Sequence, residues 1–152
     1  MTIEKYPALN LPPAELKIRE ADGCAHIWDK LRRRWLVLTP EEWVRQNFIA
    51  FLAGHCAIDE YRIAQEHRLV VNGMDMRADI VVFSRTGQPV LVVECKAPSV
   101  PIGQAVIEQV SRYNSVMNLE YAAVTNGLSH YCWQIDHEGK SFHFIPKIPE
   151  GI

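Results

Sequence analysis

The chain has 152 residues, of which 48% are hydrophobic and 22% charged, and it carries a formal net charge of −2 at pH 7. These values predict one soluble globular domain, residues 1–152, with a sizeable core. No apolar run approaches the ~18 residues of a membrane span, and residues 1–15 lack the features of a signal peptide. We therefore expect a cytoplasmic protein without membrane contact. The slightly acidic balance counts against a broadly basic nucleic-acid-binding surface.

Positive charge is nevertheless concentrated in one basic cluster, which consists of Lys30, Arg32, Arg33 and Arg34. Two interpretations of this cluster remain open. It is either a solvated turn or a contact for nucleic-acid phosphates.

The cysteines are widely scattered, at Cys24, Cys56, Cys95 and Cys132. None forms a C-x-x-C pair or a zinc-type spacing with histidine. We therefore expect reduced, mostly buried thiols, and we assign no metal to the histidines.

The N-terminal third predicts an irregular start, a β-hairpin and a helix. Residues 1–14 are proline-rich, whereas residues 15–20 and 24–29 have strand character around an Ala-Asp-Gly turn. We assign residues 1–34 to an N-terminal hairpin extension and residues 35–150 to the core. Within the core, Thr39 as cap, Pro40 at the first helical position and Glu42 in a capping box predict a helix that ends near Gly54.

The rest of the chain alternates strands with one further helix. Asn72-Gly73 and Thr86-Gly87 are turn signals between extended runs. The pattern predicts strands at 66–71, 78–84, 90–96 and 120–125, a helix at about 102–117, and a final hairpin of 129–135 and 141–145 around a turn at 136–139. This order predicts an α/β fold in which helices flank a central mixed sheet and β-hairpins are added at both ends.

Three charged residues occupy the middle two strands of this series. Asp79 opens one strand, and Glu94 and Lys96 lie near the end of the next. Residues i and i+2 of a strand share a face, so Glu94 and Lys96 point the same way, and a hairpin brings Asp79 close to them. Carboxylate oxygens are the ligands that Mg²⁺ prefers. The alternative is a solvated salt-bridge cluster at a sheet edge.

The spacing of Asp79 and Glu94-Cys95-Lys96, together with the order αβββαβ, resembles the PD-(D/E)xK nuclease superfamily. More narrowly, the chain is similar to the N-terminal nuclease domain of type I restriction enzyme R subunits, and to its small, stand-alone relatives. The motifs that carry this resemblance are TPEEWVRQ (39–46), RADIVVF (77–83), VECKAPSVP (93–101), QVSRYN (109–114) and TNG (125–127). The resemblance implies a restriction-endonuclease-like core.

The resemblance also implies a metal-dependent deoxyribonuclease. In that family the metal, Mg²⁺ or Mn²⁺, is held by the residues that match Asp79 and Glu94, and by the backbone carbonyl that matches Cys95. A metal neutralises the phosphate and generates hydroxide from water near neutral pH. Lys96 is then expected to orient or deprotonate the attacking water and to stabilise developing charge. Since two carboxylates keep a lysine protonated, its action as a free base stays open.

Further candidates flank this cluster. Gln109 and Tyr113 are four residues apart on the second helix and match the QxxxY element of the family, which implies that they line the site or contact DNA. Arg77 belongs to the same group of site-lining or DNA-binding candidates. On the first helix we favour Glu41 over Glu42 as an additional site residue, because Glu41 lies on the side of Val44 and Glu42 belongs to the cap. The alternative for both glutamates is that they only cap the helix and stabilise its dipole.

These 152 residues contain no GxxxxGK[ST] phosphate loop, so we expect no ATP-driven motor of the kind a full R subunit carries. The expected partners are DNA and either a second copy of the chain or a separate motor or specificity subunit. Two rival functions remain. One is an inactive binding module that keeps the nuclease fold; the other is a structural subunit that dimerises through its N-terminal hairpin.

Overall fold

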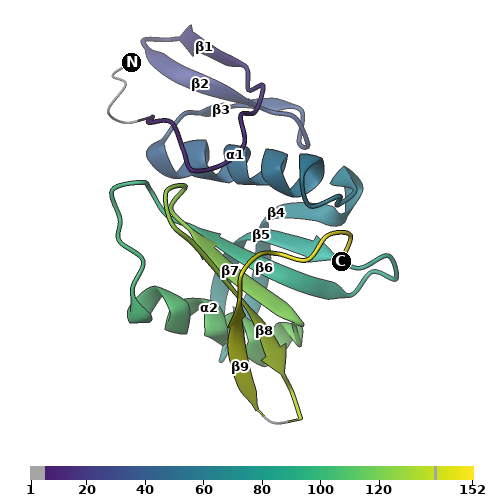
Figure 1. Cartoon of the computed structure of the whole chain (residues 1–152). Coiled ribbons are helices and arrows are strands. Elements are labelled where there is room, and N and C mark those ends of the chain that lie inside the picture. The colour runs from purple at the N-terminus through teal and green to yellow at the C-terminus, as the bar shows by residue number, and fades with distance from the viewer. Residues whose placement is uncertain (1–5, 139) are drawn as a thin grey trace.

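The computed structural model describes residues 6–138 and 140–152, and it contains two β-sheets with a helix between them (Figure 1). The expectations for residues 1–5 and for Gly139 lie outside the described residues. The small sheet holds β1 (Ile18–Ala21), β2 (Cys24–Asp29) and β3 (Arg34–Val37). The remaining elements are α1 (Pro40–Gly54), the 3₁₀ turn η2 (Glu60–Arg62), β4 (Ile63–Val71), β5 (Met74–Phe83), β6 (Pro89–Cys95), α2 (Gln104–Met117), β7 (Tyr121–Thr125), β8 (His130–Asp136) and β9 (Ser141–Ile145).

The large sheet has the strand order β4-β5-β6-β7-β8-β9. Strands β6 and β7 are parallel and the other neighbours are antiparallel, so the sheet is mixed. One face packs against α1 around Phe48 and Leu52, and the other packs against α2 around Val110 and Tyr113. The expected α/β architecture, with the order αβββαβ and added antiparallel strands at both ends, is therefore confirmed.

The start of α1 follows the predicted capping pattern. Thr39 has an extended backbone, and its hydroxyl accepts a hydrogen bond of 3.1 Å from the Glu42 backbone N–H. Pro40 occupies the first helical position, where its missing N–H costs nothing. These local interactions begin the helix after β3 and so fix the point at which α1 enters the space between the two sheets.

The small sheet has one strand more than a hairpin. β3 crosses the boundary that we expected at residue 34, and it pairs with β2 so that Leu36 lies opposite the fully buried Ile27. A four-residue strand that opens with an arginine of the basic cluster has too little alternation to be recognised alone. The two-stranded hairpin of residues 1–34 was therefore incomplete.

The turn between β4 and β5 is tighter than expected. Asn72 and Gly73 both have a positive φ, 50° and 77°, as a two-residue hairpin turn requires. Met74 pairs directly with Val71, so β5 begins four residues before the expected Ala78. Asp79, which we expected near the start of this strand, therefore lies in its middle.

Cys56, Cys95 and Cys132 are buried and Cys24 is exposed, and all four are free thiols, as expected. Among the described residues, no helix is long and apolar enough to span a membrane.

Candidate metal and catalytic site

The two candidate carboxylates meet where β5 and β6 separate. Ile80 pairs with Val93, so the preceding Asp79 and the following Glu94 stand across from each other. Asp79 Oδ2 accepts a hydrogen bond of 2.7 Å from the Cys95 backbone N–H. Glu94 is only 6% exposed. The hairpin therefore brings both carboxylates together, as predicted.

Lys96 directly follows β6 and is held by its backbone. Its N–H donates to the Thr125 carbonyl at 2.8 Å, which extends the β6–β7 pairing by one residue. Its Nζ lies 3.9 Å from Glu94 Oε1 and 3.4 Å from Gln109 Oε1. Glu94 and Lys96 thus share the α2 face of the sheet, whereas the Cys95 side chain packs in the core beside α1.

The second helix contributes both members of the Gln-x-x-x-Tyr pair. The Tyr113 hydroxyl lies 3.2 Å from Glu94 Oε2 and 3.1 Å from the Arg77 carbonyl oxygen. Gln109, one turn earlier, contacts Lys96. The structure therefore gathers Gln109 and Tyr113 over the cluster. Arg77 contributes its backbone carbonyl there, while its side chain is exposed.

Burial raises the pKa values of the acidic groups in this cluster. Burial, followed by the negative charge of Asp79, raises the pKa of Glu94 to about 8. Burial also raises the pKa of Asp79, against the lowering effects of the Cys95 N–H and of Arg45. The pKa of Tyr113 is likewise raised, first by burial and then by the charge of Glu94. Without a further cation, the carboxylate pair therefore retains a proton near neutral pH.

The available donors suit a hard cation. Asp79 and Glu94 offer carboxylate oxygens, which bind Mg²⁺ and Mn²⁺. The Cys95 thiol is buried on the other face and its pKa is raised, first by burial, so this residue can offer the metal only its backbone. No group of three or more His, Cys, Asp and Glu side chains with metal-site geometry occurs among the described residues. A metal here would complete its shell with backbone carbonyl and water oxygens.

The expectation that Glu41 faces the sheet was wrong. Glu41 is exposed, and Glu42 is the buried glutamate, 7% exposed. Glu42 binds the Arg45 guanidinium, with one contact of 2.9 Å, and accepts a hydrogen bond of 3.0 Å from Gln46. The physical reason is that the small sheet covers a second side of α1, so that residues beside the main apolar stripe are buried too.

Arg45 links this buried glutamate to the candidate site, and sequence analysis missed it. Its guanidinium is 4.0 Å from Asp79 Oδ1 and 3.6 Å from Glu66 Oε1. Its side chain is only 11% exposed. The polar stripe of Glu42, Arg45 and Gln46 at helical spacing was the available signal, because such residues share one helix face.

The polar network continues from Arg45 into the small sheet. Glu66 has a positive φ of 50° and binds Arg32 at 2.6 Å. Arg32 also binds the fully buried Asp29 at 2.5 Å, and Gln65 donates to both oxygens of Asp29 at 3.0 Å. One member of the basic cluster, Arg32, is therefore turned inward and joins β2 to the strand beside Asp79.

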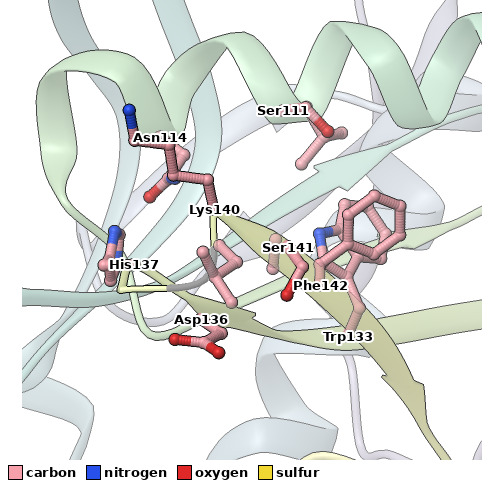
Figure 2. A pocket seen from close by; sticks show the side chains of 11 residues that line it. Ser111, Asn114, Trp133, Asp136, His137, Lys140, Ser141 and Phe142 are labelled. Carbon is pink, nitrogen blue, oxygen red and sulfur yellow. The ribbon is translucent and has the colours of Figure 1, made fainter.

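A separate hollow of about 250 Å³ lies on the α2 side of the large sheet (Figure 2). It lies between α2, represented by Ser111 and Asn114, and the β8–β9 hairpin, represented by Trp133 and Phe142. None of the candidate site residues lines it.

The mixed sheet brings two carboxylates and a lysine of adjacent strands together. The family model described as type I restriction enzyme R protein N terminus matches residues 40–149, and the chain belongs to this family. A fragment assigned to an HsdR subunit of a type I restriction enzyme from Vibrio vulnificus superposes with a TM-score of 0.41 and 24% identity, covering 58% of this chain and 19% of that one. No curated protein matches the chain significantly.

Proposed function

We propose that this chain is a Mg²⁺- or Mn²⁺-dependent DNA endonuclease domain that hydrolyses phosphodiester bonds. The observation that carries the proposal is the convergence of Asp79, Glu94 and Lys96 in one largely buried cluster, in which the pKa of Glu94 is raised to about 8. Family membership supports a restriction role, in which DNA is the substrate and other subunits supply translocation and sequence choice.

The chain's own residues have distinct roles in this mechanism. Asp79 and Glu94 would hold the metal with the Cys95 carbonyl, and the metal would supply charge neutralisation and an acidified water. The Cys95 N–H fixes the Asp79 carboxylate. Lys96, held at its backbone by Thr125, keeps its ammonium beside Glu94, where it stabilises negative charge on the scissile phosphate.

The Gln-x-x-x-Tyr pair acts as a positioning element. Gln109 accepts from the Lys96 ammonium, which limits its rotamers, and Tyr113 donates to the Glu94 oxygen that faces α2. Both contacts orient the reactive side chains before substrate arrives, which lowers the entropic part of the barrier.

One observation favours the alternative of an inactive binding module. Arg45 lies 4.0 Å from Asp79, so a protein cation already compensates part of the carboxylate charge. In a module that binds no metal, Arg45 would serve as the permanent counter-ion of Asp79.

Plasmid cleavage tests the endonuclease proposal. Wild type is incubated with supercoiled DNA and Mg²⁺ or Mn²⁺, next to Glu94→Gln, Lys96→Ala and the control Glu108→Gln, an exposed glutamate on α2. We expect nicking by wild type and the control, and a loss on the order of 10²–10³-fold for Lys96→Ala, typical of removing one electrostatic stabiliser. Identical DNA products from all four proteins would contradict catalysis at this site.

A further inference from the structure

The small sheet has an outer face that we define by Lys17, Arg19, His26, Trp28, Trp35 and Val37. The strand register places Arg19 opposite His26, His26 opposite Val37, and Trp28 opposite Trp35. Because side chains alternate along a strand, these residues lie on the face opposite to Ile27 and Asp29, which are fully buried. Lys17 joins the same face one residue before β1, where its carbonyl accepts from the Trp28 N–H at 2.9 Å.

The outer face combines flat aromatic rings with a stacked guanidinium. The Arg19 Cζ lies 4.2 Å above the centre of the Trp35 ring. The Trp28 and Trp35 rings are 5.4 Å apart and meet at 60°. Both tryptophans are partly exposed, while Arg19 is exposed and Val37 is 56% exposed. A planar guanidinium backed by an indole is a platform on which a nucleobase stacks.

Of the six residues that define the outer face, only Lys17 and Arg19 carry a formal charge, while Glu15 and Glu60 border the same hollow as Lys17 and Trp28. Lys17 and Arg19 take part in none of the ion pairs of the described residues, unlike Lys30, which pairs with Glu60, and Arg32, which pairs with Asp29 and Glu66. Alternation places Glu20 on the other face of the sheet. Two cations without an ion-pair partner, beside edge-to-face tryptophan rings, are complementary to phosphates that alternate with bases.

We propose that the outer face of the small sheet binds a single-stranded segment of nucleic acid. The platform requires bases that are free to stack, which a duplex hides and an acidic peptide lacks. The face lies outside residues 40–149, which the family model matches. Binding at this face needs no metal and does not depend on the proposed cleavage.

The test measures the binding of a labelled oligothymidylate of about 20 nucleotides by fluorescence anisotropy, in a buffer that contains EDTA. The double variant Lys17→Gln/Arg19→Gln is compared with Lys147→Gln, which removes an exposed cation elsewhere. We expect about tenfold weaker binding for the double variant and no change for the control. The slope of log K against log salt should decrease by about 1.4, since each phosphate contact on a single strand contributes about 0.7.

The stacking component is measured separately. Trp35→Phe keeps an aromatic ring but reduces its area. We therefore expect about fivefold weaker oligonucleotide binding with an unchanged melting temperature. The matched control is Trp43→Phe, which changes a tryptophan on α1. Three results overturn the proposal: equal binding by wild type and the double variant, no wild-type binding up to about 100 µM oligonucleotide, or equal affinity for duplex DNA or polyglutamate. If the proposed cleavage fails but Glu94→Gln still binds the oligonucleotide, only the endonuclease proposal fails.

Discussion

The cluster of Asp79, Glu94 and Lys96 and the outer face of the small sheet treat charge in opposite ways. The first buries negative charge, so that the pKa of Glu94 rises to about 8. The second leaves Lys17 and Arg19 exposed and unpaired beside tryptophan rings. Buried charge creates strong but costly interactions that suit chemistry, whereas exposed charge gives weak, salt-sensitive binding. The net charge of −2 is therefore an average over one region of buried negative charge and one of exposed positive charge.

The ion-pair network of Arg45 connects the two regions, because it joins Asp79 to the small sheet. A substitution of Arg45 therefore tests how much this connection stabilises the protein. We expect Arg45→Met to reduce the free energy of unfolding by about 3–5 kcal/mol, since it leaves the buried Glu42 and Asp79 without their cation. Chemical denaturation measures this loss. Arg68→Met, which breaks an ion pair that is 70% and 64% exposed, is the control and should cost less than about 1 kcal/mol. Equal losses in both variants would show that the network contributes no more than a surface pair.

The pH dependence of stability gives an effect that is smaller per pH unit. Burial raises the pKa of Glu94 from 4.5 to about 8, so the folded state holds a proton that the unfolded state releases. The metal-free protein should therefore lose stability as pH rises from about 5 to 8, by at most about 1.4 kcal/mol per pH unit for one proton. Denaturation at several pH values measures the slope, and Glu94→Gln should flatten it. A wild-type slope equal to that of Glu94→Gln would contradict the account of this carboxylate.

Local patterns in the sequence predicted most of the fold. Thr39 and Pro40 began α1 because capping depends on adjacent residues, and Asn72-Gly73 gave its turn for the same reason. The approach of Asp79 to Glu94 followed from strand alternation and a hairpin. These features are determined by neighbours in the chain.

The remaining features depend on tertiary packing. Glu41 and Glu42 could not be distinguished correctly, because the choice depends on a small sheet covering the second side of α1. Arg45 was missed for the same reason. The outer face was missed because β3 was not predicted as a strand, and without β3 neither Trp35 nor Val37 has an assigned face.

The central claim, that Asp79 and Glu94 form a divalent metal site, is tested most directly by calorimetric titration of Mg²⁺ into the metal-free protein. At pH 7 in two buffers of different ionisation enthalpy, we predict one bound Mg²⁺ with release of a proton, because Glu94 must ionise to bind. Asp79→Asn and Glu94→Gln should abolish the binding heat, and Glu41→Gln, in the exposed first turn of α1, should retain it. Absence of binding at millimolar Mg²⁺, or equal binding by Glu94→Gln, would contradict the account.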